Sequence, residues 1–179
     1  MCINHRQKSM QRGFTMIEVL IAVFVLAIGL LGLASLQTRS LQFNFSAYQR
    51  SQANVLAYDI IDRMRANRDV VLAGGYAHDL NDGPVSSTNC QGAGASCSAG
   101  DMAQFDLTQW VCSLGKWNSD TTCTGMSIEG PLAEGDGSVT ITPSGTRAMV
   151  TVTINWVDDR TLDVDDENRM ETFSVSSVL

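Results

Sequence analysis

The most distinctive pattern in the chain is a run of apolar residues from Phe14 to Leu36 that contains one charged residue, Glu18. Twenty-three residues in an α-helix span about 34 Å, which is enough to cross the hydrocarbon core of a bilayer. Glu18 interrupts the pattern, because an unpaired carboxylate in a membrane costs about 2.5–3.5 kcal/mol on insertion scales. The pattern therefore predicts a membrane helix whose one acid has a partner outside the segment.

The helical pattern continues beyond the apolar run. No proline occurs before Pro84, and Gly74-Gly75 is a natural end for a helix. The simplest prediction is one continuous helix from Phe14 to Val71, with a membrane part over residues 14–36 and an amphipathic part over residues 37–73. The apolar stripe of the second part would pack on a head and consists of residues at helical spacing: Leu41, Phe45, Tyr48, Leu56, Ile60 and Met64.

Residues 74–179 predict an α+β head. The segment 74–100 is rich in small and polar residues and predicts a loop, Asp101–Leu114 predicts a short helix, and residues 115–136 predict irregular structure. Strict alternation of apolar and polar residues then predicts half-buried antiparallel strands, with Trp156 on the buried face. The three strands expected to pack on the amphipathic helix are Ser138–Thr142, Ala148–Val157 and Arg169–Val178.

The string Gly13-Phe14-Thr15-Met16-Ile17-Glu18 resembles the prepilin leader and helix start of type IV pilins and related pseudopilins. The resemblance implies a leader of residues 1–13, cleaved between Gly13 and Phe14 by the prepilin peptidase, which then methylates the amine of Phe14. It also implies that Glu18 pairs with the N-terminal ammonium of a neighbouring subunit in the core of a fibre. Opposite charges in apolar surroundings attract strongly, so the implied pairing agrees with elementary electrostatics. Met10 is an alternative start that would shorten the leader.

Residues 12–76 are similar to the PilV family of minor pilins, the type IV pilus modification proteins. The similarity rests on Ile28–Gln37, Tyr48–Ala53, Ala57–Arg68 and Gly75-Tyr76. It implies a type IV pilin-like fold and a minor pilin that assembles with other minor pilins and the major pilin and supports pilus assembly, twitching motility or adhesion. Two features depart from the family, namely the pair Cys112 and Cys123 and the acidic segment near Asp163.

Two other functions compete with this prediction. One is a minor pseudopilin of type II secretion, because the N-terminal motif is shared. The other is a secreted binding protein, because Gly32-Leu33-Ala34 resembles a signal-peptidase site after an apolar region. Glu18 within that apolar region makes the secreted protein the poorer interpretation.

Charge is unevenly distributed along the chain. Basic residues Arg6, Lys8 and Arg12 precede the apolar run, which predicts a cytoplasmic N-terminus and a head outside the cytoplasm. The resemblance to type IV pilins implies a single pass of the inner membrane, a periplasmic head and later incorporation into an extracellular pilus. From Gly74 onward there are 4 basic and 15 acidic residues, a net charge of −11. An acidic head repels phosphates, so we expect no nucleic-acid partner.

The chain has five cysteines, and Cys2 lies in the leader. The remaining four lie in the exported part, where disulfides are expected. We favour Cys90–Cys97 and Cys112–Cys123 among the three possible connectivities, because each pair closes a short local loop. A zinc site is the competing interpretation, but the spacing is not that of a common zinc motif.

Other candidate chemistry is weak. The acidic segment offers carboxylates for Ca²⁺ at Asp163, Asp165, Asp166 and Glu167, but it lacks the glycine of an EF-hand, and a solvated loop is favoured. The two histidines, His5 and His78, belong to no catalytic motif, so we expect no enzymatic activity and no cofactor. The basic residues Arg63, Arg65 and Arg68 either form ion pairs on a solvated helix face or contact an acidic neighbour, and the pattern does not decide between the two.

Overall fold

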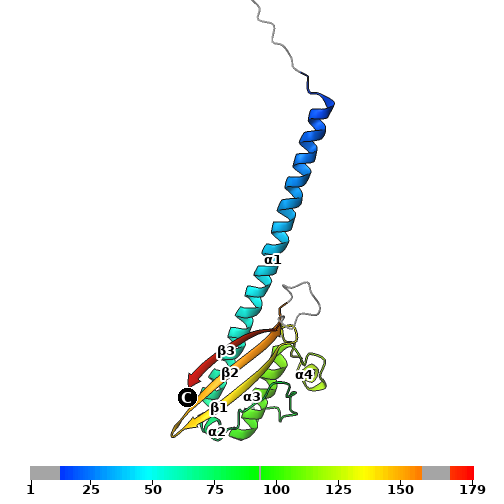
Figure 1. The fold of residues 1–179 in the computed structure, drawn as a ribbon. Coiled ribbons are helices and arrows are strands. Elements are labelled where there is room, and N and C mark those ends of the chain that lie inside the picture. The colour runs from blue at the N-terminus through cyan, green and yellow to red at the C-terminus, as the bar shows by residue number, and fades with distance from the viewer. Residues whose placement is uncertain (1–12, 93, 159–169) are drawn as a thin grey trace, which may run out of the picture. The chain divides into compact units, whose positions relative to one another are not determined.

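The computed structural model describes residues 13–92, 94–158 and 170–179. The chain divides into two compact units, one ending at Leu41 and one beginning at Gln42. Helix α1, Met16–Ala66, contributes to both units (Figure 1). The second unit also contains α2 (Arg68–Leu72), α3 (Ala99–Leu114), α4 (Thr121–Gly125) and three strands.

The long helix is interrupted once, at Asn67. The sequence predicts a single helix to Val71, but Asn67 has φ −124° and ψ 46° and separates α1 from α2. Its side-chain amide donates to the carbonyl of Ala99 at 2.7 Å and to the hydroxyl of Tyr76 at 3.3 Å. These bonds hold Asn67 to the loop that follows α2 and to the first residue of α3, and they account for the break between α1 and α2. Gly74, with φ +81°, ends the segment in a conformation that favours glycine.

The predicted apolar stripe is wrong in its first half. Phe45 and Tyr48 are 53% and 51% exposed, whereas Ala53 and Ala57 are completely buried. Ala53 and Ala57 lie in the hydrophobic cluster, and the neighbouring carbonyl of Leu56 accepts from the indole N–H of Trp110 at 3.0 Å, so small side chains face the core here and the larger apolar residues lie on the other side of the helix. The buried positions of α1 are Gln49, Ala53, Ala57, Ile60, Ile61 and Met64.

The three strands form one antiparallel sheet in the order β1-β2-β3. Strand β1 is Asp136–Ser144, β2 is Arg147–Val157 and β3 is Met170–Val178, so each predicted strand is present with slightly different ends. In the register, Val139 lies opposite Val152, which in turn lies opposite Val175. A long apolar helix with a small antiparallel sheet is the predicted α+β fold class, which is confirmed.

One face of the sheet forms the core with the helices. The buried side chains of β2 alternate with half-exposed threonines, as the sequence predicts. Together with residues of α1 and α3 they form one hydrophobic cluster, in which Trp110 is fully buried and Trp156 is 1% exposed. The β2 members of the cluster are Ala148, Val150, Val152, Ile154 and Trp156.

Two short helical features differ from the prediction. Helix α3 begins at Ala99, two residues before the predicted start, because Ser98 caps it. The Ser98 hydroxyl accepts from the amide of Asp101 and the Asp101 carboxylate accepts from the amide of Ser98. Helix α4 lies in a segment for which irregular structure is predicted. Its first turn is capped by Asp120, which accepts from the amide of Thr122 at 2.7 Å.

Replacing Ala57 by leucine tests the packing of α1 in the core. Extra methylene groups at this fully buried position have no space, so we expect the Ala57→Leu protein to be less stable by about 1–3 kcal/mol. Urea unfolding of the full-length protein in detergent measures this. Ala47 lies on the exposed side of the same helix, and Ala47→Leu should change stability by no more than about 0.5 kcal/mol. Equal effects of the two substitutions would contradict the proposed packing.

Candidate functional site

The first candidate site is the start of α1. Gly13 and Phe14 precede the helix, and the carbonyl of Thr15 accepts from the amides of Glu18 and Val19 at 3.1 and 3.3 Å. Glu18 therefore lies in the first turn, where the partial positive charge of the helix N-terminus favours a carboxylate. Phe14, Glu18 and Ala22 line one shallow groove along the helix. The sequence-predicted cleavage position, methylation position and acid are thus neighbours in space.

The surroundings of Glu18 are entirely apolar. Large apolar side chains between Phe14 and Leu36 are 53% to 87% exposed. Among the described residues, α1 is the one helix long and apolar enough to cross a membrane. An apolar surface of this extent is stable only against lipid or other apolar helices. This arrangement suggests membrane anchoring and packing in a fibre.

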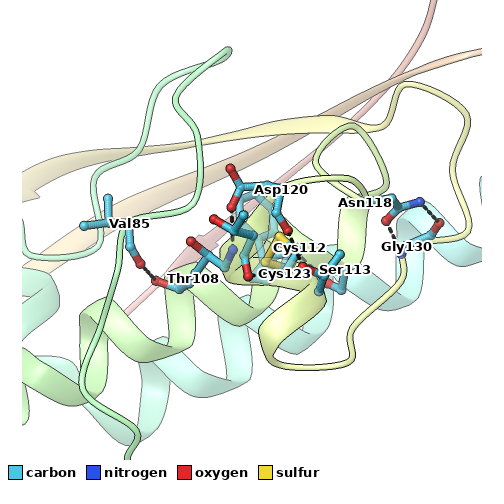
Figure 2. Close-up of a disulfide and its surroundings, with 12 residues drawn as sticks. Val85, Thr108, Cys112, Ser113, Asn118, Asp120, Cys123 and Gly130 are labelled. Carbon is cyan, nitrogen blue, oxygen red and sulfur yellow. Dashed lines mark hydrogen bonds between the residues drawn. A yellow bond between two sulfur atoms is a disulfide. The ribbon is translucent and has the colours of Figure 1, made fainter.

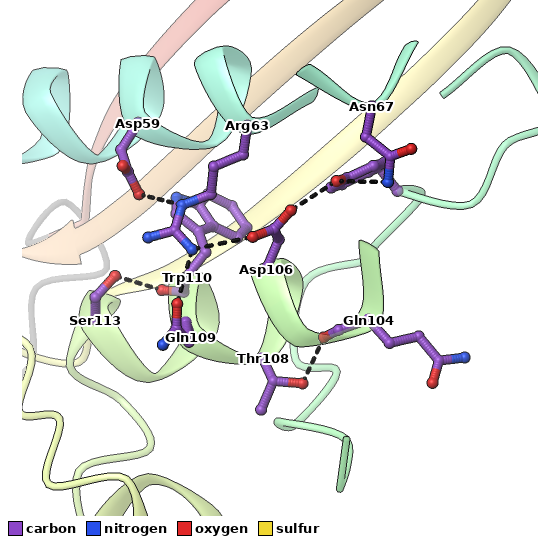
Figure 3. Close-up of polar contacts among 10 residues, drawn as sticks. Asp59, Arg63, Asn67, Gln104, Asp106, Thr108, Gln109, Trp110 and Ser113 are labelled. Carbon is purple, nitrogen blue, oxygen red and sulfur yellow. Dashed lines mark hydrogen bonds and ion pairs between the residues drawn. The ribbon is translucent and has the colours of Figure 1, made fainter. Parts of the chain in front are cut away.

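A second polar cluster joins α1 to α3 in the head, around the carboxylate of Asp106 (Figure 3). Asp106 is 8% exposed. Its Oδ1 lies 3.2 Å from Nη1 of Arg63, and its Oδ2 accepts from the hydroxyl of Tyr76 at 2.7 Å. Arg63 also pairs with Asp59 at 3.0 Å and donates to Oε1 of Gln109 at 2.8 Å. A nearly buried carboxylate thus has both a positive partner and a neutral donor.

The structure gives the contacts that the three arginines make within their own chain. Arg63 and Arg65 do form helix-face pairs, with Asp59 and Asp62 respectively. All three arginines also contact the head of their own chain. Arg63 binds Asp106, Arg65 donates to the hydroxyl of Ser177, and Arg68 donates to the carbonyl of Thr146. The sequence analysis missed Asp106 and Tyr76, since an acid within a short amphipathic helix carries no signal of its distant partner.

Another ion pair holds the opposite end of α3. Nζ of Lys116 lies 2.8 Å from Oδ2 of Asp136, and the backbone N–H of Asn81 donates to the same oxygen at 2.9 Å. Asp136 is 5% exposed. This pair joins the end of α3 to the start of β1, and nothing in the sequence pattern pointed to it.

Two disulfides stabilise the segments around α3. Cys112–Cys123 links α3 to α4 and is fully buried (Figure 2). Cys90–Cys97 closes the loop immediately before the Ser98 cap of α3. These are the two pairs that the sequence favoured. In the same region Asn118 exchanges two hydrogen bonds with Gly130, at 2.7 and 3.1 Å, which fixes the loop after α3.

The pKa shifts in the head have local structural causes. Burial, followed by the hydrogen bond to Asp106, raises the pKa of the Tyr76 phenol well above its ordinary value. The hydroxyl and amide of Ser98 lower the pKa of Asp101, which is fully exposed. Both groups hold helices in place, and neither lies beside a nucleophile.

The candidate catalytic and metal-binding residues are not brought together in the described part of the chain. His78 lines an open cavity of about 460 Å³ beside α3, and its ring lies edge-on to Trp110, with 6.3 Å between the ring centres. Within residues 13–92, 94–158 and 170–179, no three His, Cys, Asp or Glu side chains are placed to hold a metal ion. The calcium candidates Asp163, Asp165, Asp166 and Glu167, and also His5, lie outside the described residues.

Comparison with known families agrees with the geometry of the N-terminus. Residues 8–34 match the prokaryotic N-terminal methylation motif, and residues 35–108 match the family described as Type IV pilin Tt1218. No significant match to a curated protein or to a solved structure was found.

The two matches adjoin along the chain and together support a type IV pilin, a class of structural proteins.

The buried phenol of Tyr76 predicts a specific alkaline sensitivity. Because its pKa is raised in the fold, the protonated phenol contributes stability that is present below about pH 10, the ordinary tyrosine pKa, and is lost as the pH rises above it. We expect the unaltered protein to lose stability relative to Tyr76→Phe between about pH 10 and 12. Urea unfolding of both proteins at pH 8, 10 and 11 measures the difference. A constant difference across this range would contradict the buried, Asp106-bonded phenol.

Proposed function

We propose that the chain is a minor pilin of the PilV kind that takes part in assembly of a type IV pilus. The observation that carries the proposal is Glu18, the one charged residue in the apolar and exposed segment from Phe14 to Leu36, in the first turn of α1 and four residues beyond Phe14. The family matches support a pilin, and the similarity of residues 12–76 to PilV proteins supports the minor-pilin assignment.

The proposed maturation has three steps. The protein enters the inner membrane with the basic leader in the cytoplasm and the head in the periplasm. The prepilin peptidase cuts between Gly13 and Phe14 and methylates the new amine. Residues 14–36 then leave the lipid for a bundle of pilin helices, in which the amine and Glu18 of neighbouring subunits neutralise each other.

The proposed place of the subunit is a complex with other minor pilins that primes the pilus or occupies its tip. In such a complex the partners are other minor pilins and the major pilin. A type II secretion pseudopilin would share the N-terminal chemistry, but the match over residues 35–108 is to a type IV pilin family and favours the pilus. Deletion separates the two, since loss of twitching indicates the pilus and loss of enzyme secretion indicates the secretion system.

Mature protein isolated from the native membrane should begin at Phe14 and carry one methyl group on its amine. Intact-mass and N-terminal peptide spectrometry measure both features. A Gly13→Val protein, in which the residue before the cut is changed, should retain its leader. A mature chain that begins at Ser35 would instead indicate a conventional signal peptide, and an intact leader in the unaltered protein would also contradict the proposal.

Neutralising Glu18 should impair assembly without impairing insertion or cleavage. Both Glu18→Gln and Glu18→Ala leave the partner amine without a counter-charge in apolar surroundings, so we expect at least about a tenfold loss of co-purification with other pilins. Membrane fractionation, leader cleavage and pilus counts are measured on the same cells. Thr38→Ala removes only a hydroxyl bonded to the carbonyl of Ala34 within α1 and should behave normally. Unchanged pilus number and co-purification in Glu18→Gln would refute the pairing.

A further inference from the structure

The outer edge of β3 is an unpaired row of backbone groups. Leu179 and Ala148 exchange two hydrogen bonds, each 2.9 Å long. Bonded and non-bonded pairs alternate in an antiparallel ladder, so Ser177, Val175 and Phe173 also bond to β2. The backbone N–H and C=O groups of the intervening residues therefore point away from β2. These residues are all exposed: Thr172, Ser174, Ser176 and Val178.

No described residue outside β2 hydrogen-bonds to the backbone of these four residues. The opposite edge of the sheet, formed by β1, is partly covered. There, His78 exchanges backbone bonds of 3.1 and 2.8 Å with Val139, and β1 contains Pro143. Strand β3 contains no proline, and its one charged residue, Glu171, precedes residues 172–178, which contain none. Natural proteins usually protect an open edge with such residues, so the edge of β3 is open to pairing with another strand.

The side chains beside the edge of β3 form an apolar surface on which a further strand could pack. On the core side, Phe173 and Val175 are only partly buried. Arg65 of α1 donates to the hydroxyl of Ser177 at 3.1 Å, which places that side of α1 next to β3. Val55 and Tyr58 lie on the same side of the helix as Arg65 by their spacing and are 61% and 47% exposed. A strand added to β3 would extend the sheet over these apolar side chains.

The other face at this edge is polar and uncharged. Thr151 and Ser176 share a hydrogen bond of 2.9 Å across the strands, and Thr153 and Ser174 share one of 3.2 Å. A strand that continues this face needs small hydroxyl residues on one side and apolar residues on the other.

We propose that the outer edge of β3 is a strand-addition site that takes an extended segment of a different protein. The segment would alternate apolar and small polar residues and be neutral or basic. A second copy of this chain is disfavoured, because the head carries 15 acidic and 4 basic residues from Gly74 onward and two such heads repel each other. The proposal goes beyond the pilin function, since it concerns the head and not the N-terminal helix.

Photo-crosslinking in the native host tests the site. The full-length chain carries p-benzoyl-phenylalanine in place of Val178, and cross-linked products are identified by mass spectrometry. Ser174→Pro removes a backbone N–H that points away from β2, so the hydrogen bonds between β2 and β3 are kept. A carbonyl of the added strand then has no donor at this position, and the proline ring obstructs its approach. Ser174→Val is the matched control, because it removes the side-chain hydroxyl and keeps the backbone N–H.

We expect a cross-link to another protein that falls about tenfold or more with Ser174→Pro and persists with Ser174→Val. A product that is equally strong in both variants, a product made only of this chain, or no product would overturn the proposal. Both disulfides and protease resistance of the head show whether the proline variant is folded, and Ser176→Pro serves as a second variant.

Amide hydrogen exchange on the full-length protein that carries p-benzoyl-phenylalanine at position 178, without a proline substitution, gives an independent readout if either proline variant unfolds. Peptides covering residues 170–179 should gain protection of the four outward amides in the cross-linked complex relative to the purified protein. Equal exchange in the two samples would overturn the proposal. Normal cleavage at Gly13 and normal pilus number in the same strain separate a failure at β3 from a failure of the pilin function.

Discussion

The near-complete burial of the Asp106 carboxylate is the constraint on which the head depends. A buried charge without partners is strongly unfavourable, so the fold must bring a cation and a donor to it. Nη1 of Arg63, on α1, lies 3.2 Å from one carboxylate oxygen of Asp106, and the hydroxyl of Tyr76, in the loop after α2, donates to the other at 2.7 Å. Because these groups come from three separate segments, the carboxylate determines how α1, the loop and α3 are arranged. Asn67 completes the arrangement by leaving the helical conformation to bind Tyr76 and Ala99.

The same contacts explain where sequence reasoning succeeded and failed. The strands were predictable because alternation in β2 is a local signal that records which face is buried. The break in the helix at Asn67 was not predictable, because its cause is a hydrogen bond to the carbonyl of Ala99, 32 residues away. The predicted apolar stripe of α1 was wrong in its first half for a related reason. Hydrophobicity favoured Phe45 and Tyr48, whereas the positions that face the core are occupied by the small residues Ala53 and Ala57.

The candidate site at the N-terminus was predictable in more detail than the head. Its residues, Gly13, Phe14 and Glu18, lie within six positions of one another, so their proximity follows from their short separation along the chain. The ion pair between Lys116 and Asp136 shows the contrast, since its partners join a helix end to a strand and no periodicity links them. The two disulfides lie between these cases, because short spacing favours a pairing without determining it.

Within the head, α1 buries Ile60, Ile61 and Met64, but some of its small residues are also buried while several large apolar residues are exposed. It buries alanines and exposes Phe43, Val55 and Tyr58 by 63%, 61% and 47%. Burial of a large side chain contributes roughly 1.5–3 kcal/mol, so an isolated head would be more stable if these residues faced its own core. Small residues occupy core-facing positions of α1, whereas these large residues face outward. In the first unit, the segment from Phe14 to Leu36 exposes predominantly apolar side chains and one charged residue, Glu18, a surface that is stable against lipid or other apolar helices.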